Sequence, residues 1–176
     1  MSPSAGELTG PAAGPVTSGY LASFEPAMRM AIEQAMAAGG TDVPVGAVVL
    51  DAAGTIVAGA RNRREADADP TAHAEIVAIR AAARALGDWR LTGCTLVVTL
   101  EPCTMCAGAV TAARLDRLVY GAADPRAGAA GSLRDVLHDR RLGPDVEVIG
   151  GVLATECGAL LRDFFGQLRN HGGRDG

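Results

Sequence analysis

Two short stretches of the chain carry side chains that could bind one metal ion together. The first, Glu-Pro-Cys-Thr-Met-Cys at 101–106, places Cys103 and Cys106 three residues apart. Pro102 is typical of the first turn of a helix, so both sulfurs should point to one side of that turn. The positive end of the helix dipole favours thiolates there, and a divalent cation would offset the repulsion between them.

The second stretch, Asp-Pro-Thr-Ala-His-Ala-Glu-Ile at 69–76, supplies an imidazole and a carboxylate. His73 and Glu75 are two residues apart, at the expected start of another helix. A lone histidine there is usually a cap or a satisfied core residue, but a cysteine pair in a similar strand-to-helix setting favours a metal ligand. His73, Cys103 and Cys106 are three ligands with one open position, the arrangement of a catalytic zinc site.

The sequence allows two other interpretations of the cysteine pair. A structural zinc site needs a fourth protein ligand, whereas Cys94 and Cys157 look like small core residues. A thioredoxin-like redox pair leaves His73 and Glu75 without a role. The pattern therefore favours catalytic zinc, with one ion per chain.

A zinc ion with an open position can activate water. In known catalytic sites the pKa of the bound water falls towards about 7. We expect Glu75 to take a proton from that water and to deliver protons to a ring nitrogen and a departing amine. Attack on an amidine carbon with loss of ammonia is hydrolytic deamination, and the spacing matches the pattern H-x-E…P-C-x-x-C of zinc-dependent deaminases.

The elements that must position these residues alternate between helices and strands. Helices are predicted over 24–38, 72–86, 103–114, 132–138 and 154–168, and strands over 43–50, 55–59, 95–100, 117–121 and 146–149. The first two strands are close enough for a hairpin, whereas the later strands need crossovers and should be parallel. These elements predict a three-layer α/β/α fold in which helices cover both faces of a five-stranded mixed sheet.

Length and composition set further bounds. The 176 residues predict one domain over 21–169, with a disordered tail at 1–20 and a short tail at 170–176. All sixteen basic residues are arginine, and the net charge of −4 gives no global attraction to nucleic acid. RNA binding would therefore need a local basic patch. No signal peptide and no apolar run of membrane length is visible, so we expect a reducing, cytoplasmic setting and no membrane.

Three further features lie outside the metal motifs. Gly46 interrupts a buried strand, which indicates either close approach of a ligand or a tight contact of helix on sheet. The charged stretch 61–65 is interpreted as a solvated turn, with Asn62 as the exception. The polar loop at 122–131 follows a strand, and loops near strand ends commonly carry function.

These residues resemble the cytidine deaminase-like zinc enzymes and, more specifically, the bacterial tRNA-specific adenosine deaminases. The resemblance covers about 24–169, and the zinc motifs alone identify only the superfamily. Gly-Ala-Ala-Gly-Ser-Leu at 128–133 and the double phenylalanine at 164–165 narrow it to the tRNA enzymes. The residues on which the resemblance rests are 43–48, Asn62, 69–76, 99–109, 128–133 and 156–165.

The resemblance implies a cytidine deaminase-like fold and hydrolysis of adenosine to inosine at the wobble position of an arginine tRNA anticodon. It also implies a homodimer in which the anticodon loop contacts both subunits. By position, His73, Cys103 and Cys106 would hold zinc, and Glu75 would shuttle protons.

The resemblance also assigns contacts to the substrate. Asn62 would bond the target base, Asp124 would contact the nucleotide backbone beside it, and the N–H groups of Ala74 and Cys103 would lie near the reacting centre. Because a flipped base needs apolar walls, Val43 and Leu100 are candidate walls. Three arginines could meet phosphates or could simply be solvated: Arg126, Arg140 and Arg141.

The chain departs from the family pattern at two places. Ala123 stands where the family usually has arginine, and Gly143-Pro144 stands where it has Asn-His, whose asparagine contacts anticodon nucleotides. These losses should weaken RNA binding or alter specificity while leaving the zinc chemistry intact. Two rivals therefore remain: a free-base or nucleoside deaminase for guanine or cytosine, and a non-catalytic zinc-bearing RNA-binding subunit. Retention of Glu75 speaks against the second.

Overall fold

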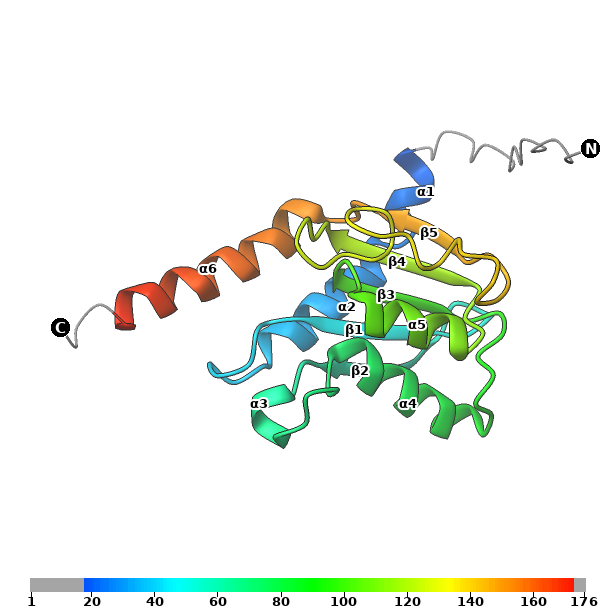
Figure 1. Ribbon diagram of the computed structural model, residues 1–176, viewed down its shortest axis with the longest axis horizontal. Coiled ribbons are helices and arrows are strands. Elements are labelled where there is room, and N and C mark those ends of the chain that lie inside the picture. The colour runs from blue at the N-terminus through cyan, green and yellow to red at the C-terminus, as the bar shows by residue number, and fades with distance from the viewer. Residues whose placement is uncertain (1–17, 173–176) are drawn as a thin grey trace, which may run out of the picture.

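A five-stranded sheet forms the centre of the computed structural model, which describes residues 18–172 (Figure 1). The strands are β1 (Gly46–Leu50), β2 (Ile56–Arg61), β3 (Thr95–Leu100), β4 (Arg117–Ala122) and β5 (Glu147–Gly150), in the order β2-β1-β3-β4-β5. β1 pairs antiparallel with β2 and with β3, whereas β3, β4 and β5 run parallel to one another. The predicted mixed sheet is thus confirmed.

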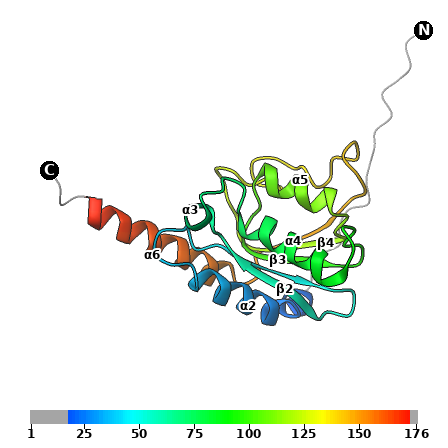
Figure 2. The ribbon, with the colours of Figure 1, turned by 90° about the horizontal axis from the view of Figure 1, so that it is seen from below.

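Helices cover both faces of this sheet, as Figure 2 shows. α4 (Ala74–Leu86) and α5 (Thr104–Ala112) pack on one face, and α2 (Glu25–Met36) and α6 (Ala154–Gly172) on the other. Two short helices, α1 (Ser18–Ala22) and α3 (Arg64–Asp67), were not expected from the sequence. The three-layer α/β/α prediction is confirmed.

A hydrophobic core cluster lies on each face of the sheet, and β1 contributes side chains to both. Ala47 and Val49 pack with the residues of α4 and α5, whereas Val48 and Leu50 pack with those of α2. All five residues of β1 are buried, as an unbroken apolar run predicts for a central strand.

The two spare cysteines belong to these cores. Cys94 lies in the cluster under α4 and α5, and Cys157 lies in the cluster under α2 and α6. Both side chains are buried, at 3% and 1% exposure, so the prediction that they are small core residues is confirmed.

The helix predicted at 132–138 is wrong. This segment forms turns, and Asp135 pairs with Ala130 in an isolated bridge. A helix would direct backbone N–H groups to carbonyls four residues earlier. Here the N–H of Val136 donates instead to the carbonyl oxygen of Ala129 at 3.0 Å, and the N–H of His138 donates to the side chain of Asp135 at 3.3 Å.

The predicted tails are shorter than expected where the structure describes them. Ser18 to Tyr20 lie in α1, so the prediction of a disordered tail over 1–20 is wrong for these three residues. The Tyr20 hydroxyl donates to Glu147 at 2.7 Å and its ring packs edge-on against Phe24, which attaches α1 to the body. α6 continues to Gly172, and the rest of both predicted tails, 1–17 and 173–176, lies outside the described residues.

None of the helices between residues 18 and 172 combines the length and the apolar character that crossing a membrane requires.

Gly46 marks the point where α2 lies against β1. A Cβ atom at this position would be 2.0 Å from the carbonyl oxygen of Ala31 and 2.5 Å from the backbone nitrogen of Ala35. Of the two explanations for this glycine, the structure shows the tight contact of helix on sheet.

Replacing Gly46 tests this contact. We expect Gly46→Ala to lower the free energy of unfolding by about 3 kcal/mol, because the added methyl group must push a helix backbone away from the sheet. Urea unfolding followed by circular dichroism measures the change. Gly39→Ala is the matched control, since nothing lies within 4 Å of its Cβ position. Equal stability of Gly46→Ala and the wild type would contradict this packing.

Candidate metal centre and active site

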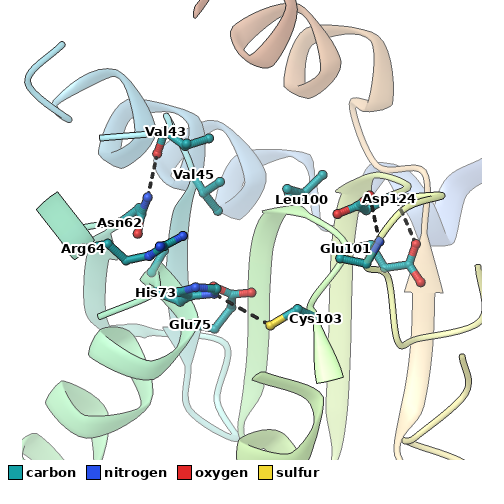
Figure 3. A pocket seen from close by; sticks show the side chains of 12 residues that line it. Val43, Val45, Asn62, Arg64, His73, Glu75, Leu100, Glu101, Cys103 and Asp124 are labelled. Carbon is teal, nitrogen blue, oxygen red and sulfur yellow. Dashed lines mark hydrogen bonds between the residues drawn. The ribbon is translucent and has the colours of Figure 1, made fainter. Parts of the chain in front are cut away.

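Two helix N-termini bring the metal-binding side chains together. His73 is the N-cap of α4 and Cys103 is the N-cap of α5, and both have extended backbone conformations. Cys106 lies in the first turn of α5. Because both helices begin beside the same end of the sheet, ligands that are 30 or more residues apart in sequence become neighbours (Figure 3).

The three ligand atoms are close to one another. His73 Nδ1 lies 3.8 Å from Cys103 Sγ and 3.5 Å from Cys106 Sγ, and all three atoms fall within 4.8 Å of one another. Across residues 18–172 no other cluster of histidine, cysteine and acidic side chains is arranged to hold a metal ion. The residues predicted as ligands from spacing therefore converge.

The pKa shifts of the two cysteine thiols favour the binding of a cation. Hydrogen bonds from the Cys106 thiol and from His73 lower the pKa of Cys103 to about 3. The neighbouring Cys103 and then burial raise the pKa of Cys106. The opposite directions of these two shifts mean that the pair favours one thiolate and one proton between its two sulfurs. A divalent cation in place of that proton would compensate two thiolates, and one imidazole with two thiolates is a donor set that catalytic zinc takes. The residues fit the ion.

Glu75 points toward the same place from the first turn of α4 (Figure 3). Its side chain is buried, and burial raises the pKa of its carboxyl group. It is not a member of the ligand cluster. A carboxyl group beside the ligands but outside the cluster is free to carry a proton.

A pocket opens over His73, Glu75 and Cys103. Every residue predicted to contact substrate lines it: Val43, Asn62, Ala74, Leu100 and Asp124. Val45 and Ala127 also line the pocket and were not predicted. Val45 is a buried residue immediately before β1 that its sequence does not distinguish from other core positions, whereas Ala127 is exposed and lies in the loop at 122–131.

Asn62 places an unused acceptor in the pocket. Its Nδ2 donates to the carbonyl oxygen of Val43 at 3.2 Å, and its backbone N–H donates to Val45. Its Oδ1 is buried and has no hydrogen-bond partner among the described residues. Buried polar atoms are rarely left unpaired, so this oxygen indicates a ligand that donates a hydrogen bond.

Arg64 is a pocket residue that the sequence analysis missed, because it lies in a stretch interpreted as a solvated turn. The turn is instead the helix α3, whose first N–H groups, from Glu65 and Ala66, donate to the buried carboxylate of Asp42. Among the side chains that the structure describes, at 18–169, none forms a hydrogen bond or ion pair with the guanidinium of Arg64. A charged donor at the pocket rim is therefore available to a ligand.

The candidate phosphate contacts differ in their surroundings. Arg140 pairs with Asp145, and Arg141 pairs with Asp139 through two hydrogen bonds. Both pairs are on the surface, which agrees with the solvated alternative. Arg126 is exposed, and no ion pair engages its side chain within the described residues.

Comparison with known proteins agrees with this geometry. The family model for the cytidine and deoxycytidylate deaminase zinc-binding region matches residues 22–122. The tRNA-specific adenosine deaminase of Bacillus subtilis is 49% identical over 128 residues, which are 73% of this chain and 79% of that protein. A tRNA(Ile)-lysidine synthase of Deinococcus deserti is 51% identical over 143 residues, 81% of this chain, but the chain spans only 26% of that longer protein.

Solved structures show the same relationship. A structure from a study of A-to-I editing by tRNA:A34 deaminases is 42% identical, with a TM-score of 0.74, and the match covers 77% of this chain and 99% of that one. The guanine deaminase from Nitrosomonas europaea is 26% identical with a TM-score of 0.68, over 80% of this chain and 83% of that one.

The fold and the site define the class of protein: a zinc-dependent deaminase. The chain belongs to the cytidine deaminase-like family and, within it, to the tRNA-specific adenosine deaminases.

Metal analysis of purified variants tests the ligand set. We expect the wild type to carry close to one zinc ion per chain, and Cys106→Ala to lose most of it, because two remaining ligands hold zinc weakly. Inductively coupled plasma mass spectrometry gives the ratio. Cys94→Ala should keep its zinc, because that buried cysteine lies in the core and outside the ligand cluster. Full zinc occupancy in Cys106→Ala would rule out this site.

Proposed function

We propose that this protein hydrolyses adenosine to inosine at the wobble position of an arginine tRNA anticodon. One observation carries the proposal: His73, Cys103 and Glu75 line one pocket and Cys106 completes the ligand cluster, in a chain whose family includes tRNA-specific adenosine deaminases. The reaction adds water to the base and releases ammonia, so the pocket must bind a purine, supply a nucleophile and move protons.

In this proposal His73, Cys103 and Cys106 hold the zinc ion. When bound, the ion supplies a Lewis acid that makes water a nucleophile near neutral pH. Glu75 accepts the proton of the attacking water on its carboxylate and passes it to the ring nitrogen beside the reacting carbon. A second proton transfer through the same carboxylate protonates the departing amine. The burial of Glu75 keeps bulk water from competing for these protons.

The pocket walls supply recognition of the base. Val43 and Leu100 are half-buried apolar side chains on the pocket lining, suited to the faces of a flipped base. Asn62 Oδ1 would accept a hydrogen bond from the base edge. Ala74 is the first residue of α4, so its N–H has no acceptor within the helix. In this proposal that N–H donates a hydrogen bond to the substrate at the end of α4 that carries His73.

The pocket rim supplies recognition of the nucleotide backbone. Arg64 offers a guanidinium, whose fork of donors suits phosphate, and Asp124 would contact the neighbouring nucleotide. We further propose a homodimer that holds the anticodon loop between two subunits, working in the cytoplasm.

The two departures from the family pattern lie away from this pocket. Neither Ala123 nor Gly143-Pro144 lines it, and a Cβ on Gly143 would meet Thr111 and Arg114 near the end of α5. Their effect should therefore fall on contacts with the rest of the RNA and not on the base. A guanine deaminase is the second candidate, because a guanine deaminase shares this fold and the departures reduce the expected RNA contacts.

Replacing Glu75 tests the proton carrier. We expect Glu75→Gln to keep zinc and fold but to lower kcat by about 10³-fold, because the amide cannot accept and return a proton. Steady-state assays at saturating substrate give kcat, and metal analysis with circular dichroism checks zinc and fold. Activity within about tenfold of the wild type would show that another group carries the proton.

A choice of substrates tests the proposed function itself. The protein is incubated with an arginine anticodon stem-loop, and separately with free adenosine, guanine and cytosine. We expect inosine from the stem-loop and little product from the small molecules, because the backbone contacts at the pocket rim need RNA. Mass spectrometry of the digested products identifies the base.

A stem-loop with guanosine at the wobble position is the matched control and should give no inosine. Xanthine from guanine, with an unreacted stem-loop, would reject the tRNA assignment and support the guanine deaminase.

A further inference from the structure

A buried carboxylate beside the metal centre has no part in the mechanism above. Glu101 follows β3 and stands two residues before Cys103. Its side chain is 2% exposed, and it also borders the pocket. Burying a carboxylate is costly unless it is well hydrogen-bonded, so its partners indicate what it does.

All of the hydrogen bonds that Glu101 accepts come from one segment. Its Oε1 accepts the backbone N–H groups of Ala130 and Ser132, each at 3.0 Å. Its Oε2 accepts the backbone N–H of Asp124 at 3.0 Å and the hydroxyl of Ser132. We call residues 124–132 the wall segment, because Asp124 and Ala127 on it line the pocket. Figure 3 shows Asp124 beside Glu101.

The backbone of the wall segment also lies directly against the metal-binding turn. The N–H of Ala129 donates to the carbonyl oxygen of Pro102 at 2.8 Å, and Gly128 forms an isolated bridge with Cys103. A Cβ on Gly128 would lie 2.5 Å from the carboxyl carbon of Glu101 and 2.5 Å from the carbonyl oxygen of Asp124. Glycine at this position is therefore required for the carboxylate to reach its donors.

We propose that Glu101 is a positioning residue that holds the wall segment in its substrate-binding shape before substrate arrives. Residues 127–132 of the segment are alanine, glycine and serine only, and a chain of that composition is flexible unless it is held. One carboxylate with four donors orders both ends of the segment. Ordering the segment in advance lowers the entropic cost of binding, so the benefit falls on substrate affinity. This inference rests on the proposed function only for the identity of the substrate.

The effect of Glu101→Gln follows from the donor arrangement. One orientation of the amide directs its NH₂ group at two backbone N–H donors, those of Ala130 and Ser132. The other directs it at the N–H of Asp124 and at a hydroxyl that can rotate and accept. The variant should adopt the second orientation and lose the hydrogen bond to Asp124.

In the zinc-loaded full chain we expect Glu101→Gln to raise KM for the anticodon stem-loop about tenfold, with kcat within about threefold of the wild type. Hydrogen–deuterium exchange of the 124–132 peptides should become faster, while zinc content stays unchanged. Glu101→Ala should show the same pattern more strongly, so that glutamine partly rescues the loss.

Three variants accompany this experiment. Gly128→Ala crowds the carboxylate without changing it, and it should also raise KM and exchange. It decides the question if Glu101→Gln does not fold. Ser132→Ala removes one hydroxyl donor but keeps its backbone N–H, so its effect should be smaller. Gly39→Ala has open space at its Cβ position and should match the wild type.

The outcomes separate the possible roles of Glu101. Unchanged KM and unchanged exchange in Glu101→Gln and Gly128→Ala would overturn the inference. Loss of zinc with unchanged KM would also overturn it, because Glu101 would then serve the metal centre alone. Exchange needs no substrate, so faster exchange in a protein that ignores the stem-loop would count against the proposed function and not against this inference.

Discussion

The crowding of two sulfurs and an imidazole nitrogen constrains everything around the pocket. Within 4.8 Å of one another, these atoms cannot all take their metal-binding forms without a cation. Two helix N-termini, at His73 and Cys103, ease the problem because both direct positive dipole ends toward the thiolates. The metal centre is therefore prepared electrostatically by backbone geometry as well as by the identity of its ligands.

That geometry depends on a sheet whose helices can approach closely. Gly46 admits the backbone of α2 against β1, and Gly121 leaves room for Cys157 of α6 against β4. On the opposite face, Ala74, Ala78 and Ala82 bring α4 close to the sheet. Close packing of small side chains therefore fixes where these helices lie on the sheet, and on the α4 face it fixes the first turn that carries His73 and Glu75.

The parts that could be read from the sequence are those that local spacing controls. Cys103 and Cys106 share one helical turn, and His73 with Glu75 shares another, so each pair was predictable. The strands, the hairpin of the first two and the parallel pairing of the later ones followed from hydrophobic runs and connection lengths. Arg64 was missed because α3 depends on the remote carboxylate of Asp42. The helix predicted at 132–138 was wrong because two N–H groups that it would need bond elsewhere, that of Val136 to the carbonyl of Ala129 and that of His138 to the side chain of Asp135.

The placement of Glu101 two residues from a zinc ligand has a consequence for how such an enzyme can change. A single turn of chain serves both the catalytic metal and the surface that selects the substrate. Neither part is a module that can be exchanged alone. A laboratory graft of a different wall segment would have to preserve the amide donors of residues 130 and 132 and a glycine at 128, whatever new specificity its other side chains encode.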